Sequence, residues 1–188
     1  MKFRDAIEKR CDVKRFDLKK PNWRKVVRAV DAARFSSSAG NHFAVRFILV
    51  TDESAIDKIS KSCQQDFISG SKCVVVAVSD PSSLIRSYGD RATKYCELQA
   101  GAAIQNFLLG LENEGLVTSW VWYYVDEEVK RILDIPEGAS VQGIFPIGGK
   151  TKVSGKAKRN AKLENVLFFG KYGERKMRPK TEVTRDSV

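Results

Sequence analysis

The sequence predicts one α+β domain built around a long buried helix. Its 188 residues suit a single domain with one sizeable core, and its 43% hydrophobic and 30% charged residues are ordinary for a globular protein. Between residues 98 and 111 the apolar side chains lie on two faces of a helix, which leaves only a narrow polar seam. A helix that is apolar almost all round is buried almost all round, in the middle of a domain or across a subunit interface.

The other predicted elements alternate between amphipathic helices and apolar strands. Helices are expected over residues 2–10, 21–35 and 127–134, after an N-cap at Asp52 and, with a break near Gly89, after Asp80. Strands are expected over residues 45–50, 73–78, 116–122 and 141–147. The run from Cys73 to Val78 is continuously apolar, which predicts a strand in the centre of its sheet. Residues 150–162 are polar and lysine-rich, which favours a loop.

Charge and rare residues limit the classes of function. The net charge of +10, concentrated near the two ends, fits either a nucleic-acid surface or a cluster around a phosphate-bearing small molecule. The single histidine, His42, excludes a histidine-rich metal site, and the four cysteines form no CxxC pair. We expect Cys63 and Cys73 to be small buried hydrophobes. The sequence contains neither an apolar run of membrane-spanning length nor a signal peptide, so we expect a cytoplasmic protein without a membrane partner.

Three segments, in this order, resemble the nitroreductase family: GAAIQNFLLGLENEGLVTSWVW, DEEVKRILDIPEG and VQGIFPIGG. The family resemblance implies an FMN-dependent oxidoreductase with a central mixed or antiparallel sheet flanked by helices. It also implies an intertwined homodimer that holds the flavin at the subunit interface. Residues 1–170 would form the FMN-binding domain, whose end at residues 166–169 resembles the arm that wraps the other subunit. Residues 171–188 would be a charged C-terminal tail.

The resemblance places the FMN phosphate between basic residues from both ends of the chain. Arg10 and Lys14 match the outer positions of the family's R-x-S-x-R-like motif, and Arg159 would complete the phosphate clamp after the glycine turn. Asp12 stands where the family usually has serine. Because a carboxylate repels a phosphate, Asp12 must point away or pair with Arg10. A surface turn with scattered charges is the alternative interpretation.

The remaining cofactor candidates contact the ribityl chain or the ring. They are Ser37, Ser38, Asn41, Gln65, Ser119 and Trp120. Ser38 and Asn41 match the family's small-residue loop, while Ser37 replaces a usual proline. Gln65 matches a polar residue ahead of the buried strand, and the backbone near Ser119 and Trp120 would offer an N–H group to the flavin N5 side. A plain serine-rich turn is the alternative for the loop.

The resemblance implies a ping-pong reaction in which a hydride passes from NADH or NADPH, through FMN, to a small nitroaromatic or quinone-like acceptor. No catalytic side chain is predicted, because hydride moves directly between stacked rings and solvent supplies protons. Two alternatives stay open. The same fold could serve flavin or cofactor metabolism or dehalogenation. A non-enzymatic basic domain that binds nucleic acid is disfavoured, because the sequence lacks an aromatic-plus-basic stacking pattern.

Overall fold

The structure is a computed structural model that describes residues 1–17, 19–151 and 161–177. The chain divides into two compact units, Met1–Lys156 and Ala157–Val188. Among the described residues, no helix combines the length and the apolar character that a membrane crossing requires.

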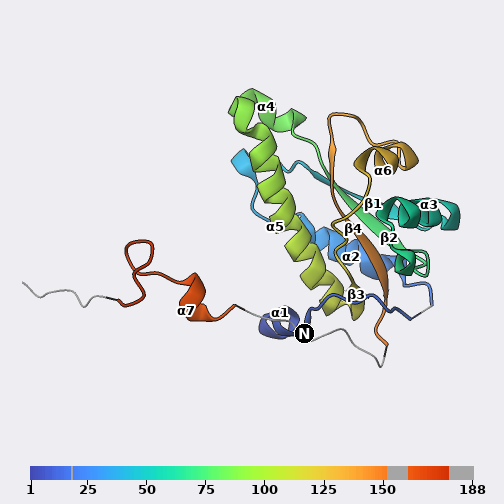
Figure 1. Cartoon of the computed structure of the whole chain (residues 1–188), viewed down its shortest axis with the longest axis horizontal. Helices are drawn as coiled ribbons and strands as arrows, with labels where there is room; N and C mark the ends of the chain where they lie inside the picture. Colours follow the sequence, from blue (N-terminus) through green and yellow to red (C-terminus); the bar gives the residue numbers. More distant parts are fainter. Residues whose placement is uncertain (18, 152–160, 178–188) are drawn as a thin grey trace, which may run out of the picture. The chain divides into compact units, whose positions relative to one another are not determined.

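The first unit is built on one four-stranded antiparallel sheet (Figure 1). Its strands, in the spatial order β1-β2-β4-β3, are β1 (Val45–Val50), β2 (Val74–Ser79), β4 (Ser140–Gly149) and β3 (Leu116–Thr118). Every residue of β2 is buried, because β2 lies between two strands and both sheet faces are covered. The expected central strand is therefore confirmed. β3 is shorter than expected, since only three residues pair with the end of β4.

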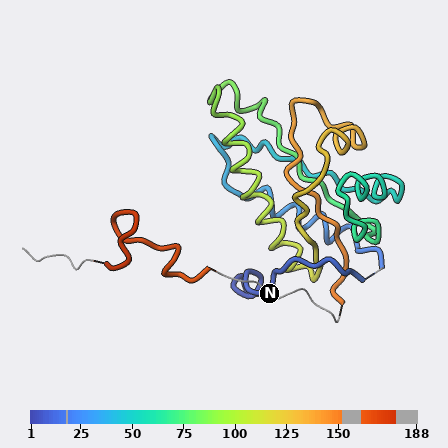
Figure 2. The backbone as a smooth tube through the Cα atoms, in the orientation of Figure 1, coloured from blue at the N-terminus to red at the C-terminus, as the bar shows by residue number. Residues whose placement is uncertain are grey.

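Helices cover both faces of this sheet (Figures 1 and 2). The helices of the first unit are α1 (Phe3–Lys9), α2 (Trp23–Ala33), α3 (Glu53–Cys63), α4 (Ser82–Tyr88), α5 (Ala92–Asn113) and α6 (Asp126–Ile132). α2 and α5 pack on one face, and α3 and α6 pack on the other. α2 and α5 approach so closely that a Cβ atom at Gly110 would lie 2.9 Å from the Ala29 Cα atom. Glycine is therefore required at this contact.

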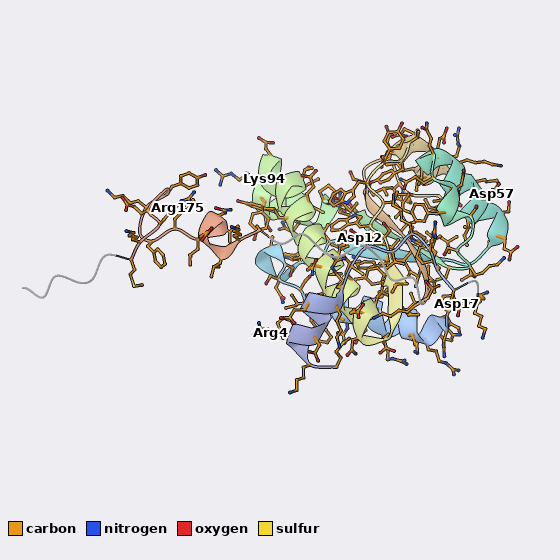
Figure 3. All side chains as sticks on the ribbon, turned by 60° about the horizontal axis from the view of Figure 1, so that its bottom comes forward. Arg4, Asp12, Asp17, Asp57, Lys94 and Arg175 are labelled. Atoms are coloured by element: carbon orange, nitrogen blue, oxygen red, sulfur yellow. The ribbon has the colours of Figure 1, made fainter. Side chains whose placement is uncertain are left out.

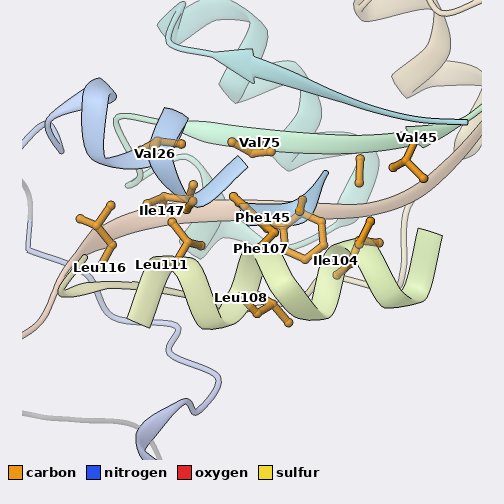
Figure 4. Packing of buried hydrophobic residues seen from close by; sticks show 14 of the residues in the cluster. Val26, Val45, Val75, Ile104, Phe107, Leu108, Leu111, Leu116, Phe145 and Ile147 are labelled. Atoms are coloured by element: carbon orange, nitrogen blue, oxygen red, sulfur yellow. The ribbon is translucent and has the colours of Figure 1, made fainter. Parts of the chain in front are cut away.

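The inner side of α5 forms the main core (Figure 4). The Phe107 ring lies 5.4 Å from the ring of Phe47 and 5.4 Å from that of Phe145, and Ile104 and Leu111 are buried beside it. The opposite side of the helix is open in the single chain. Its Leu98 is 63% exposed, although the apolar pattern predicted burial almost all round. The core cluster to which α5 contributes lies on one side of this helix, so it covers that side alone.

The described part of the second unit, residues 161–177, contains one short helix, α7 (Leu163–Val166). After α7 the Phe168 and Tyr172 rings lie 4.8 Å apart, and the Phe169 N–H group donates to the Glu174 carbonyl oxygen. Leu163 and Val166 are exposed. The arm-like segment 166–169 thus has apolar side chains without a core of its own, whereas its predicted role in wrapping a partner stays a prediction.

Candidate active site

The N-terminal segment runs beside β3 after α1 ends. Asp12 forms a parallel bridge with Thr118, and the Val13 N–H group donates to the Thr118 carbonyl oxygen at 2.9 Å. Further along, Asp17 pairs with Gly149 at the end of β4. Figure 3 labels both aspartates on this segment. The structure thereby brings Arg10, Asp12 and Lys14 to the strand that leads into Ser119 and Trp120.

Asp12 pairs with Arg10, which is one of the two arrangements that the repulsion argument allowed. The Arg10 Nη1 atom donates to Asp12 Oδ1 at 3.4 Å, and the Arg10 side chain is 14% exposed against 59% for Asp12. A guanidinium group carries five N–H donors, so one long bond to Asp12 leaves others for an anion. Arg10 therefore retains the chemistry that a phosphate site needs.

Lys14 points toward the turn that carries Gln65. Its Nζ atom lies 5.2 Å from the centre of the Phe67 ring, and the Phe16 and Phe67 rings lie 6.2 Å apart. Gln65 is half-buried at the start of this turn, where its carbonyl oxygen accepts a hydrogen bond from the Ser60 hydroxyl. We call Arg10, Asp12, Lys14, Gln65, Ser119 and Trp120 the strand group.

Trp120 is fixed at the end of the strand group. Its Nε1 atom donates to the Gln142 carbonyl oxygen at 3.2 Å, and its ring stacks on that of Trp122 at a centroid distance of 4.1 Å. Ser119 is buried beside it. The expected strand over residues 116–122 is wrong beyond Thr118, because β3 ends there and Trp122 is 72% exposed.

The serine loop lies against the N-terminal half of α5. Ser38 precedes a 3₁₀ turn over Ala39–Asn41, in which Gly40 and Asn41 adopt left-handed conformations with φ of 57° and 60°. Ser37, Ser38 and Ala39 line a shallow hollow of about 270 Å³, and α5 supplies its other wall. We call Ser37, Ser38 and Asn41 the loop group. No hydrogen bond or ring contact joins the two groups within the part of the chain that the structure describes.

Burial also decides the state of the thiols. It raises the pKa of the Cys63 thiol and of the Cys73 thiol to about 11, so both groups are neutral at physiological pH. The prediction that they are small buried hydrophobes is confirmed.

Arg159, which was predicted to complete the phosphate clamp, lies outside the described residues.

These features define an α+β domain with a basic segment beside a strand end and a serine-lined hollow on its long helix. Residues 59–149 match the model of the nitroreductase family. A curated protein of Methanocaldococcus jannaschii that carries a nitroreductase name is 31% identical over 87 residues, which cover 46% of this chain and 43% of that protein. The resemblance to the nitroreductase family is therefore confirmed, over a matched segment that spans less than half of the curated relative.

Solved structures extend the likeness to nearly the whole chain. The NADPH:FMN oxidoreductase of Vibrio harveyi, complexed with NAD⁺, superposes with a TM-score of 0.81 at 18% identity, covering 92% of this chain and 78% of that one. An FMN-dependent nitroreductase of Clostridium difficile gives a TM-score of 0.74 at 18% identity, with coverage of 89% and 98%. At these identities the structures establish the nitroreductase fold of this chain.

Proposed function

We propose that this chain is an FMN-dependent oxidoreductase that passes a hydride from NADH or NADPH to a small nitroaromatic or quinone-like acceptor in a ping-pong reaction. The observation that carries the proposal is the placement of the basic N-terminal segment along β3, directly before Ser119 and Trp120. Two solved relatives of the same fold are described as FMN enzymes.

In this proposal the basic residues of the strand group bind the phosphate end of FMN. Arg10 and Lys14 would donate charge-assisted hydrogen bonds to the phosphate, with Arg159 as a third cation. Asp12 would stay paired with Arg10 and hold its guanidinium in place, at a cost of some repulsion from the phosphate. Arg10 and Lys14 together outweigh the negative charge of Asp12. The net positive charge of these three residues suits the binding of a phosphate.

The ring and ribityl chain would meet the remaining candidates. Ser37, Ser38, Asn41 and Gln65 would supply polar contacts, and the backbone around Ser119 and Trp120 would face the reactive edge of the ring. FMN, when bound, supplies the hydride-transfer chemistry, and the protein binds and orients it. No side-chain acid or base is required, since solvent can supply protons.

A homodimer would complete the site. On the outer side of α5, Leu98 is exposed and Ala102 and Leu109 are half-buried, although all three side chains are apolar. Two copies packed on this side would remove it from water, and hydrophobic burial would drive the association. One copy would then contribute its strand group and the other its loop group to each flavin.

The proposal is tested with purified protein mixed with FMN and desalted. We expect a retained flavin absorption spectrum, bleaching of that spectrum by NADH or NADPH without oxygen, and recovery on addition of a nitroaromatic or a quinone. Parallel lines in double-reciprocal initial-rate plots would support the ping-pong order, and gel filtration should give the size of a dimer. Folded protein that elutes as a monomer and retains no added FMN would contradict the proposal.

A further inference from the structure

A buried side-chain amide on α5 lacks a hydrogen-bond acceptor. Gln99 is 4% exposed, and its Oε1 atom accepts a hydrogen bond from the Ala44 N–H group at 3.3 Å. This bond fixes which end of the amide is oxygen, because an amide nitrogen cannot accept from a backbone N–H group. Among the described residues, nothing accepts a hydrogen bond from Gln99 Nε2. Such a buried, unpaired donor is costly and calls for a structural reason.

The same amide side chain lines the hollow that contains the serine loop. Ser37 and Ser38 supply its polar edge, and α5 supplies an apolar wall of Tyr95, Leu98 and Ala102. The hollow thus combines an apolar wall with one unsatisfied amide donor, that of Gln99. This combination suits a planar ligand that is apolar at one end and carries hydrogen-bond acceptors at the other.

We propose that Gln99 binds the flavin ring by donating a hydrogen bond from Nε2 to a carbonyl oxygen of its pyrimidinedione end. This inference rests on the proposed function. The dimethylbenzene end of the ring would face the apolar wall. Leu98 is largely exposed, so its side chain can change rotamer as a ring enters the hollow. Gln99 would then be satisfied at both ends of its amide, at Ala44 and at the ring.

The test compares two variants of Gln99 with a control on the same helix. Gln99→Glu keeps the oxygen that accepts from Ala44 N–H and replaces the donating NH₂ group with a second oxygen. Gln99→Met removes the amide without adding charge, in case a buried carboxylate prevents folding. Thr93→Glu is the control, because it adds the same charge to α5 at an exposed position.

FMN affinity of the apoprotein is measured by quenching of flavin fluorescence, alongside gel filtration and thermal melting. We expect both Gln99 variants to bind FMN about tenfold more weakly than the control, with unchanged elution volume of the apoprotein, because loss of one hydrogen bond of about 1.4 kcal/mol changes affinity tenfold. Affinity within twofold of the control would overturn the inference. So would dissociation of the apoprotein variants, which would assign the amide to a subunit contact. Wild-type protein that binds no FMN would instead overturn the proposed function itself.

Discussion

The two sides of α5 are nearly equal in apolar character and opposite in what they contact. The inner side, with Ile104, Phe107 and Leu111, packs against the sheet and α2. The outer side carries Leu98, which the described residues leave 63% exposed. Apolar periodicity therefore indicates how much of a helix leaves water, but not which surface covers it. The inner side makes the fold, and we assign the outer side to the proposed dimer and flavin site.

Phe107→Ala should give the largest effect, because it removes the ring at the centre of the inner side. Truncation of a fully buried phenylalanine typically costs about 3–5 kcal/mol. We expect the free energy of unfolding, measured by urea denaturation of the apoprotein, to fall by this amount or the chain to fail to fold. A loss below about 1 kcal/mol would mean that the inner side does not hold the core together.

Leu98→Arg should change the outer side without harming the fold. The side chain is largely exposed in the single chain, so the melting temperature of the separated subunit should change little. A charge buried at a subunit contact is costly, so dimerisation and FMN retention should both be lost.

Thr93→Arg is the matched control for Leu98→Arg. It places the same charge at an exposed position of the same helix, on the side opposite to Leu98. Gel filtration and flavin absorbance of the two variants are compared. A monomeric Leu98→Arg protein that keeps its flavin would break the proposed coupling between the outer side and cofactor binding.

Arg10→Ala should weaken FMN binding without affecting the core. Among the described residues the guanidinium bonds to Asp12, which is exposed, so loss of this ion pair should cost little stability. The Arg10 side chain is itself 14% exposed, so its lost packing should lower stability, but by less than Phe107→Ala does. A hydrogen bond to a charged group is worth about 1.5–3 kcal/mol, which predicts a loss of FMN affinity of roughly tenfold to a hundredfold. Riboflavin, which has no phosphate, is the control ligand. Equal losses for FMN and riboflavin would place Arg10 away from the phosphate.

The sequence predicted those features that depend on local pattern. The apolar run from Cys73 to Val78 was enough to predict the central strand, and the alternation of helices and strands was recovered in order. The exposure of Trp122 was not predictable, because the apolar run continues past Thr118 although the pairing of β3 with β4 stops at Thr118 and Ile147. The orientation of Gln99 was not predictable either, since it depends on an N–H group 55 residues away, at Ala44. Such long-range pairing leaves no periodic signal.

No sequence pattern indicated that the residues of the candidate site would separate into a strand group and a loop group. The family resemblance aligned Arg10 and Ser38 to one cofactor, yet the structure places Arg10 beside β3 and Ser38 beside α5. The pairing of Arg10 with Asp12 was open to charge reasoning, because opposite charges two residues apart in an extended segment can reach one another. Its geometry still had to come from the structure.

Asp12→Ser should give the smallest effect. The direction in which FMN affinity changes tests whether the strand group binds a phosphate or is a surface turn with scattered charges. If the group binds a phosphate, the carboxylate repels it and also occupies an Arg10 donor at 3.4 Å. Its removal should therefore tighten FMN binding. Asp12 is more than half exposed, so screening limits the gain to about two- to fivefold, which corresponds to the ~0.2–1 kcal/mol of an exposed ion pair. The gain should shrink at about 0.5 M salt, where the Debye length falls below the span of the site.

Fluorescence titration with FMN and riboflavin, at low and high salt, measures the ratio of variant to wild-type affinity for each ligand. Weaker FMN binding by Asp12→Ser would show that Asp12 acts mainly by holding Arg10 in place, whereas an unchanged affinity for both ligands would favour a surface turn whose charges do not meet the cofactor.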